Sequence, residues 1–378
     1  MNITIHGQGA ISAAGSSAAD AWKHYVAGKT CWTVDAKTGH PVYRVDDLPE
    51  NPEVEAFATK NSPDRAALLA LYAADEAVRE AGWQGQDFAI LVGCSRGPTE
   101  SWEEGFRHFA GAGTAEVRTS PKTTLGSIGF ALADYFGTSS LASSLSVTCS
   151  SGMHAILHGI ALLKSGMAKR VLVGGAEAPL TTFTLRQLEA LRIVAPVPEA
   201  SVHACRPMDQ PASGMVVGEG AAFLALSLAD PATDAGKPRI TALAYARERQ
   251  AVPTGISPTG EGLQQTMREA IDQGGWPEVI IAHAPGTKRG DMAELAAIKA
   301  TCLDAQQAPF LTSFKWATGH TFGGSGPLAI SAALGILKHR ACPQIPYSPD
   351  CNPTRPIDLI LINATGFGGN VVSLMVRR

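Results

Sequence analysis

Four segments of the chain carry residue types that can support covalent or proton-transfer chemistry. In the first, Cys149 stands within residues 147–152 (VTCSSG), between an apolar run and a stretch with helical periodicity. A cysteine at a strand-to-helix turn lies near the positive end of the helix dipole, where its thiolate is stabilised and backbone N–H groups can hold an oxyanion. Taken alone, the pattern also fits a small cysteine used for packing.

Two histidines stand in the second and third segments. His283 follows the apolar run 279–282 and precedes a turn rich in Gly and Pro, which places it at the carboxyl edge of a sheet, where α/β proteins bind ligands. His320 follows Lys315 by five residues, just before glycines that open a helix. Such a turn could also cradle a phosphate, and His283 alone could be a capping or core histidine. The fourth segment, residues 365–370, is rich in Gly and could be an ordinary hairpin turn.

The pattern that surrounds these segments predicts an α/β fold, because short apolar runs alternate with amphipathic stretches. A helix is expected over Arg65–Ala81, ended by Gly82, and another after Gly152. The looser segment 229–238 predicts a boundary between two similar α/β halves, residues 1–230 and 231–378. The expected strands are 88–92, 145–148, 171–173, 222–226, 279–282, 359–362 and 371–376.

Composition excludes several classes of protein. Of 378 residues, 45% are hydrophobic and 17% are charged, which excludes a disordered chain. The net charge is −3, and no block of like charges indicates a nucleic-acid or membrane partner. Seven cysteines, an odd number without a Cys-x-x-Cys pair, argue against a disulfide framework or a metal site. With no signal-peptide pattern and no apolar run near the ~18 residues of a membrane span, we expect a cytoplasmic protein.

Together the four segments resemble one family, the β-ketoacyl-acyl-carrier-protein synthases. The resemblance runs from about residue 60 to the C-terminus and includes residues 174–178 (GGAEA), 205–209 (CRPMD) and 214–221 (GMVVGEGA). These segments follow one another in the same order as in the family, and the numbers of residues between them are similar. It implies a thiolase-like fold, in which two α/β halves form α-β-α-β-α layers, and it implies no cofactor.

The resemblance also implies the roles of individual residues. Cys149 would carry the acyl group as a thioester, and His283 and His320 would stabilise the enolate formed when a malonyl thioester loses its carboxylate. Lys315 would adjust the electrostatics of the site. The backbone N–H groups of Cys149 and Phe367 would form the oxyanion hole.

Further roles concern substrates and partners. Thr287, Phe367 and Gly368 are the expected substrate-binding residues, and the partners are acyl carrier protein in its acyl and malonyl forms. Arg206 is the candidate for docking the carrier, the alternative being a structural arginine paired with Asp209. In the family the strand within residues 141–148 lies at a dimer interface. A dimer is therefore expected, either with a second copy or with a chain-length partner of the same fold.

Differences from related families narrow the interpretation. Thiolases carry a second cysteine in the C-terminal Gly-rich turn, where this chain has Phe367, and chain-starting synthases have Asn where it has His320. The elongating class fits best. Pro285 replaces a threonine of the family pattern, and Ala329 replaces a glutamate. These two differences favour a specialised pathway, such as one that makes polyenes, over housekeeping fatty acid synthesis. The alternatives are a non-catalytic chain-length subunit and a cysteine hydrolase, which would explain neither His320 nor the Gly-rich turns.

Overall fold

The computed structural model describes residues 2–199, 202–209, 211–249, 256–302, 308–348 and 356–378, and within them ten strands form one continuous sheet. Its order is β11-β10-β12-β13-β9-β1-β8-β6-β4-β5. A small second sheet contains β2 (Thr33–Val34), β3 (Pro41–Tyr43) and β7 (Val217–Gly218). The strands of the large sheet are β1 (Ile3–Ser12), β4 (Ala89–Gly93), β5 (Ala142–Leu145), β6 (Val171–Glu177), β8 (Gly220–Leu228), β9 (Arg239–Arg247), β10 (Val279–Ile281), β11 (Phe310–Thr312), β12 (Leu359–Gly366) and β13 (Asn370–Arg377).

The large sheet consists of two halves with the same topology. When the five strands of each half are numbered along the chain, both halves have the spatial order 3-2-4-5-1. In both, the first three strands of that order are parallel and the other two are antiparallel to their neighbours. The halves meet where β1 pairs with β9, at Ile3 opposite Ile240. The expectation of two similar α/β halves is therefore confirmed.

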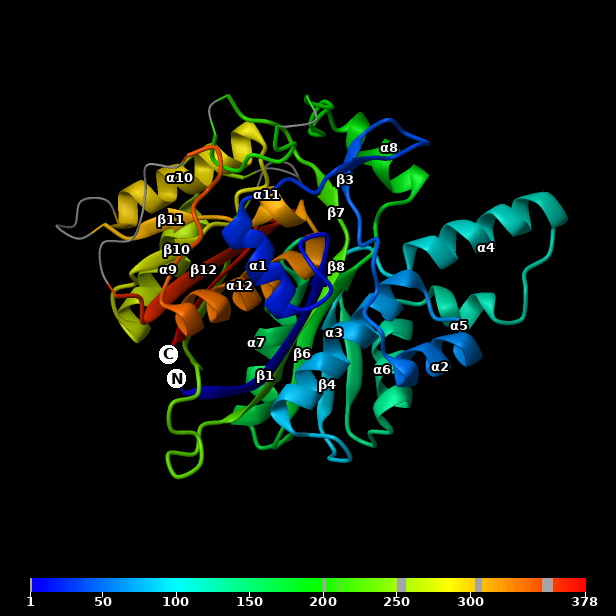
Figure 1. Ribbon diagram of the computed structural model, residues 1–378, viewed down its shortest axis with the longest axis horizontal. Helices are drawn as coiled ribbons and strands as arrows, with labels where there is room; N and C mark the ends of the chain where they lie inside the picture. The colour runs from blue at the N-terminus through cyan, green and yellow to red at the C-terminus, as the bar shows by residue number, and fades with distance from the viewer. Residues whose placement is uncertain (1, 200–201, 210, 250–255, 303–307, 349–355) are drawn as a thin grey trace.

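Helices complete five layers (Figure 1). The helices α7 and α12 lie between the two halves of the sheet. The helices α3 and α6 cover the outer face of the N-terminal half, and α9 and α10 cover the outer face of the C-terminal half. The helices are α1 (Ala18–Ala27), α2 (Pro52–Asn61), α3 (Arg65–Ala81), α4 (Thr99–Ala112), α5 (Thr119–Thr123), α6 (Ser127–Phe136), α7 (Ser151–Lys164), α8 (Thr182–Ala190), α9 (Glu261–Gly274), α10 (Lys288–Cys302), α11 (Lys315–Thr318) and α12 (Ser325–His339), with a 3₁₀ turn at Phe322–Gly324.

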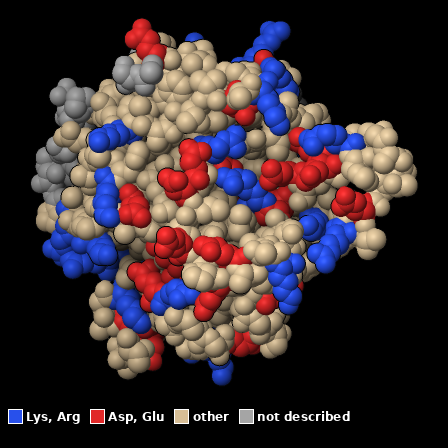
Figure 2. All heavy atoms as spheres, turned by 45° about the vertical axis from the view of Figure 1, so that its right-hand side comes forward, with Lys and Arg blue, Asp and Glu red and all other residues tan. Residues whose placement is uncertain are grey.

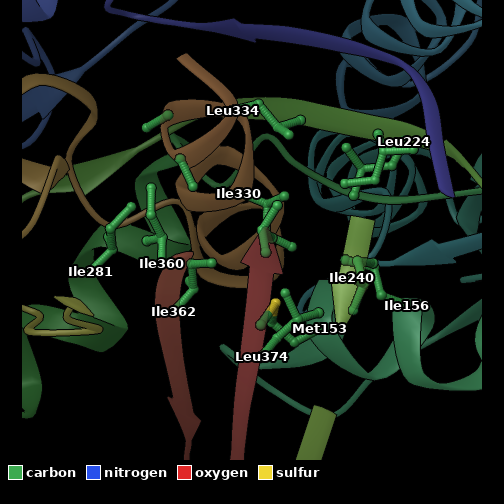
Figure 3. Close-up of a cluster of buried hydrophobic side chains, with 14 of the residues drawn as sticks. Met153, Ile156, Leu224, Ile240, Ile281, Ile330, Leu334, Ile360, Ile362 and Leu374 are labelled. Atoms are coloured by element: carbon green, nitrogen blue, oxygen red, sulfur yellow. The ribbon is translucent and has the colours of Figure 1, made fainter. Parts of the chain in front are cut away.

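The central layer is held by apolar side chains from both halves. Figure 3 shows Met153 and Ile156 of α7 and Ile330 of α12 packed in one cluster with Leu224 of β8 and Leu374 of β13. All five are fully buried. Because burying one such side chain contributes roughly 1.5–3 kcal/mol, this cluster fixes the two central helices, and the turns that lead into them, against both halves.

Helix α3 shows how closely local sequence sets an element. Asp64 caps its first turn by accepting the Ala66 N–H at 2.9 Å, and Gly82 ends it in the left-handed region at φ +67°. Its Ala-rich face packs on β1, where a Cβ on Gly9 would lie 2.0 Å from the Ala73 carbonyl oxygen. The predicted bounds of this helix are confirmed. The glycines of β1 that allow the close packing also weaken the strand pattern of its sequence.

The strand expected at 145–148 is displaced, and β5 ends at Leu145. Beyond it the backbone N–H of Val147 donates to Ser151 Oγ at 2.9 Å and Thr148 adopts φ +51°, so the chain turns instead of extending. In the described part of the sheet β5 is the last strand of the order, which leaves it at an edge.

Two features of the outer surface complete the description. Helix α4 and α5 project from the body (Figure 1), and no residue of α4 is buried. Within the described ranges, no helix is both long and apolar enough to cross a membrane.

Candidate active site

The fold brings the four chemistry-bearing segments to one cavity of about 560 Å³, which is lined by Cys149, His283, His320 and Phe367. Cys149 lies between β5 and α7, and His320 lies between β11 and α12, so the two residues occupy corresponding turns of the two halves. The internal duplication thus places the cysteine and one histidine at the N-terminal ends of adjacent central helices.

The turn that carries Cys149 is fastened to the C-terminal Gly-rich turn. Thr148 Oγ1 donates to the Phe367 carbonyl at 3.1 Å. A Cβ on Gly366 would lie 2.3 Å from Thr148 Oγ1, so only glycine allows this approach. The backbones of Cys149 and Phe367 are held side by side, an arrangement in which two N–H groups can face one developing oxyanion.

Electrostatics around the thiol differ from the sequence-based expectation of a stabilised thiolate. Cys149 is 6% exposed. Burial, and secondly the negative charge of Glu177, raise the pKa of Cys149 to about 12, and the opposing effects of Lys315 and Arg96 are smaller. The expectation was wrong on this point, because desolvation of the charged form outweighs the nearby cations. Near pH 7 the sulfur is therefore a thiol.

A buried carboxylate holds the backbone at His283. Glu294 accepts the N–H groups of His283 at 2.9 Å and Ala284 at 2.7 Å, and the side-chain amide of Asn363 donates to it at 3.1 Å. The Lys315 ammonium donates to the His283 carbonyl. These contacts fix the position of the imidazole, whose ring centroid lies 5.2 Å from that of His320.

The second imidazole is positioned by its own turn. His320 Nδ1 lies 3.0 Å from Ser325 Oγ, which leaves Nε2 as the ring nitrogen able to act on a ligand. Burial first, and then the charge of Lys315, lower the pKa of His283 and of His320 well below the ordinary value. Both rings are therefore neutral near pH 7, and a neutral imidazole can donate an N–H hydrogen bond without carrying charge.

Lys315 is itself buried, and burial lowers its pKa, while the negative charges of Glu294 and Asp291 act in the opposite direction. Ala329, at the position where the family has a glutamate, lies with Lys315 and Ser325 around a gap of only about 10 Å³. The carboxylates that balance Lys315 in this chain thus come from α10.

Comparison with known proteins decides the family. The family models "Beta-ketoacyl synthase, N-terminal domain" and "Beta-ketoacyl synthase, C-terminal domain" match residues 1–232 and 239–347. The chain belongs to the β-ketoacyl synthase family. It is 26% identical to the tetracenomycin polyketide synthase ketoacyl synthase alpha subunit of Streptomyces glaucescens, over 97% of this chain and 95% of that one.

Two further relatives cover nearly the whole chain. The synthase is 26% identical to 3-oxoacyl-[acyl-carrier-protein] synthase 2 of Staphylococcus aureus (strain N315), over 100% of this chain and 98% of the relative. The solved ishigamide ketosynthase/chain length factor shares the fold, with a TM-score of 0.85 at 21% identity over 100% and 98% of the two chains. The expected thiolase-like fold and the expected family are confirmed.

Glu177 is a site residue of this synthase whose role the sequence did not reveal. Its buried carboxylate accepts the N–H groups of Ser95 at 2.7 Å, Arg96 at 2.9 Å and Gly323 at 3.0 Å. It thereby joins the loop after β4 to the turn that follows His320. In the sequence it stands in segment 174–178 (GGAEA), as an acidic residue at the end of an apolar run.

The expected binding residues separate into two groups. Thr287 and Phe367 line the cavity, together with Pro285, Lys288 and Arg289. Gly368 is not among the lining residues. Its carbonyl accepts from Arg247 Nε at 3.1 Å, and its φ of +85° shapes the turn, so its expected contact with substrate stays a prediction.

Arg206 forms an ion pair with Asp209, which was the alternative to a role in docking the carrier protein. Its Nε lies 2.9 Å from Asp209 Oδ2, and the Arg206 side chain is 29% exposed. A group of side chains able to hold a metal ion is not found among the residues with described positions.

A second cavity of about 420 Å³ lies beside Cys149. It shares Cys149 and Phe367 with the first cavity and is lined in addition by Arg96, Trp102 and Phe322. Cys149 thus stands between two chambers. A larger groove of about 940 Å³, between α1, α3 and α12, contains none of the expected catalytic residues.

Proposed function

We propose that this family member is an elongating β-ketoacyl-acyl-carrier-protein synthase of fatty acid or polyketide synthesis. It would join an acyl group held on Cys149 to the carbanion derived from malonyl-acyl carrier protein. The observation that carries the proposal is the meeting of one thiol and two neutral imidazoles, Cys149, His283 and His320, in a single cavity.

The first half-reaction is acyl transfer. Cys149 attacks the carbonyl carbon of an acyl thioester, its thiol proton passes to the departing pantetheine sulfur, and the acyl group remains as a thioester on Cys149. The backbone N–H groups of Cys149 and Phe367 stabilise the oxyanion, worth roughly 10²–10³ in rate for each such donor. Because the pKa of Cys149 is raised to about 12, the thiolate must be generated as the substrate binds.

The second half-reaction forms the carbon–carbon bond. The malonyl thioester loses carbon dioxide, and the electron pair of the broken bond becomes an enolate whose oxygen accepts hydrogen bonds from His283 and His320. The enolate carbon then attacks the Cys149 thioester and expels the thiolate. Neutral imidazoles suit this step, because they favour the enolate oxygen over the neutral carbonyl oxygen.

The two chambers suggest separate paths for the two parts of the substrate. The pantetheine arm would reach Cys149 through the larger chamber past Thr287, and the acyl chain would extend into the smaller chamber past Phe367. An acidic carrier protein would meet Lys288 and Arg289 at this side. On the face shown in Figure 2, cations and carboxylates are interspersed and no extended basic surface is seen.

We further propose that the functional unit is a dimer, either of two copies or with a chain-length partner. Two observations support this. Strand β5 is an edge strand whose four residues are all partly exposed, and unpaired strand edges readily add a second chain. Nearby, α4 exposes Trp102, Phe106 and Phe109 by 53%, 58% and 51%. A cytoplasmic location, and the division into residues 1–230 and 231–378, also stand as proposals.

The test is intact-protein mass spectrometry after incubation with a panel of acyl-carrier-protein thioesters, followed by malonyl-acyl carrier protein. We expect a mass gain located on Cys149 and its loss when the β-ketoacyl product forms. Cys149→Ala should show neither, with Cys205→Ala as the matched control that removes a different buried thiol. Acylation of the Cys149→Ala protein would contradict the proposal.

A further inference from the structure

Phe322 has a backbone conformation that a bulky residue rarely adopts. Its φ is +39°, in the left-handed region, although the side chain is only 3% exposed and packs in an apolar cluster with Cys149. Thr148, next to Cys149, and Ala284, next to His283, also have positive φ. Such a conformation costs free energy in any residue with a Cβ, and strained residues of this kind cluster at active sites. The strain at Phe322 therefore asks for a functional explanation.

Hydrogen bonds hold the backbone on both sides of Phe322. Before it, the N–H of His320 donates to the carbonyl of Val216 at 2.7 Å, next to β7. After it, the N–H of Gly323 donates to the buried carboxylate of Glu177 at 3.0 Å. A strained conformation persists only where the surroundings determine it in this way. The direction in which the Phe322 side chain leaves the backbone is therefore set by the fold around it.

The ring of Phe322 covers one face of the imidazole of His320. The two rings are stacked, with centroids 5.0 Å apart and planes inclined by 27°. His320 lines the larger chamber and Phe322 lines the smaller one, whereas Cys149 lines both. The phenyl ring thus separates the imidazole from the smaller chamber. At its edge the imidazole is held by Ser325, whose Oγ lies 3.0 Å from Nδ1.

We propose that Phe322 is a positioning residue for His320, holding the plane of the imidazole so that Nε2 points at the enolate oxygen. This inference rests on the proposed function and adds a residue to it. A single hydrogen bond from Ser325 lets the imidazole tilt about Nδ1, and a ring stacked on its face opposes that tilt. The same ring keeps water of the smaller chamber away from the imidazole, which favours its uncharged form.

The experiment measures release of carbon dioxide from malonyl-acyl carrier protein by the Cys149→Ala enzyme, which cannot hold an acyl chain in the smaller chamber. Phe322→Leu, Phe322→Met and Phe322→Tyr are each added to this background. The matched control is Phe57→Leu, which removes a partly buried ring of α2 that packs on Tyr135. The charged or titratable side chains around His320 and Phe322, none of which these substitutions alter, are Cys149 (Ala in this background), Arg96, Glu177, His283 and Lys315.

In Phe322→Leu we expect kcat to fall roughly ten-fold with KM within about two-fold of the parent, because a misplaced imidazole affects the enolate more than substrate binding. Phe322→Met should behave in the same way and makes the comparison if the Leu variant does not fold. Phe322→Tyr keeps the ring and should retain most of the activity, as should the Phe57→Leu control.

Nuclear magnetic resonance of isotope-labelled histidine gives a second readout, assigned by comparison with His320→Ala. In the parent the pKa of His320 is well below its ordinary value, because of burial and the charge of Lys315. Loss of the phenyl ring lets water reach the imidazole, so this pKa should rise toward the ordinary value in Phe322→Leu and stay low in Phe322→Tyr.

Several outcomes would overturn the inference. Unchanged kcat in both Phe322→Leu and Phe322→Met would remove the role of the ring, and equal losses in the Leu and Tyr variants would assign the effect to side-chain fit. A lower kcat with unchanged His320 resonances would place the action of Phe322 on the substrate. A similar loss in Phe57→Leu would indicate general destabilisation. Absence of carbon dioxide release by the Cys149→Ala parent would instead refute the proposed function itself.

Discussion

Replacing Glu177 by Gln tests the electrostatic account of the nucleophile. Burial is the main cause of the raised pKa of Cys149, and the negative charge of Glu177 is the second cause. Removing one negative charge at an effective dielectric constant of about 20 should lower this pKa by about one unit. Below both pKa values the thiolate fraction is proportional to 10 to the power (pH − pKa), so alkylation of Cys149 should become about ten-fold faster at every pH from 7 to 10.

The assay is iodoacetamide labelling of Cys149, quantified by peptide mass spectrometry over this pH range. Wild-type labelling should rise about ten-fold per pH unit without a plateau, because the pKa of about 12 lies above the range. Cys205 provides an internal control, since burial raises its pKa to about 12 without a contribution from Glu177. Glu189→Gln, at an exposed position, is the matched control variant. An unchanged Cys149 profile in Glu177→Gln, or equal acceleration at Cys205, would refute the reasoning.

The same substitution has a structural cost that can be measured separately. The Glu177 carboxylate accepts three backbone N–H groups, and a Gln side chain keeps one acceptor oxygen and presents an NH₂ group where the other oxygen was. Each buried donor left without an acceptor costs about 1–3 kcal/mol. We therefore expect the Tm of Glu177→Gln to fall by a few degrees while its circular dichroism spectrum is unchanged.

The remaining predictions concern catalysis, docking and assembly. Cys149→Ala should abolish acyl transfer yet still release carbon dioxide from malonyl-acyl carrier protein, measured as bicarbonate; loss of both activities would deny the division of labour. His283→Ala and His320→Ala should each slow condensation by roughly 10²-fold or more but leave Cys149 acylation partly intact, and normal condensation by both would contradict their roles. Arg206→Glu should raise KM for carrier-bound substrates more than for a pantetheine thioester if it docks the carrier, whereas an equal effect supports the ion pair with Asp209. Light scattering should find a dimer, alone or with a chain-length partner, and a fully active monomer would argue against pairing through β5.

Elements with strong local signals were predictable from the sequence. The Ala- and Leu-rich helix α3 has a capping Asp64 and a terminating Gly82, and its predicted bounds match the structure. Strand β10 and the first half of β12, residues 359–362, are continuous apolar runs, as is typical of strands covered on both faces. In these segments propensity, capping and burial favour the same structure.

Other elements escaped prediction because tertiary contacts decide them. Strand β1 contains Gly7 and Gly9, which weaken any strand signal but are required where α3 packs against it. Strand β5 is short and built of small residues, and its end is set by the contact between Val147 and Ser151, which no propensity reveals. The thiol of Cys149 was placed correctly, but its pKa depends on how deeply it is buried and on Glu177, a residue 28 positions away in the chain.

The duplicated topology explains how one structural device can serve two different kinds of residue. Cys149 and His320 each precede a central helix, α7 or α12, at corresponding turns of the two halves. At the first turn, burial keeps the free sulfur a thiol, while the backbone N–H groups beside it can stabilise a developing oxyanion. At the second turn, burial and the charge of Lys315 lower the pKa of His320 and keep its imidazole uncharged. A single repeated strand-to-helix turn thus provides one position suited to holding an anion and another that keeps a hydrogen-bond donor uncharged, and condensation requires both within one cavity.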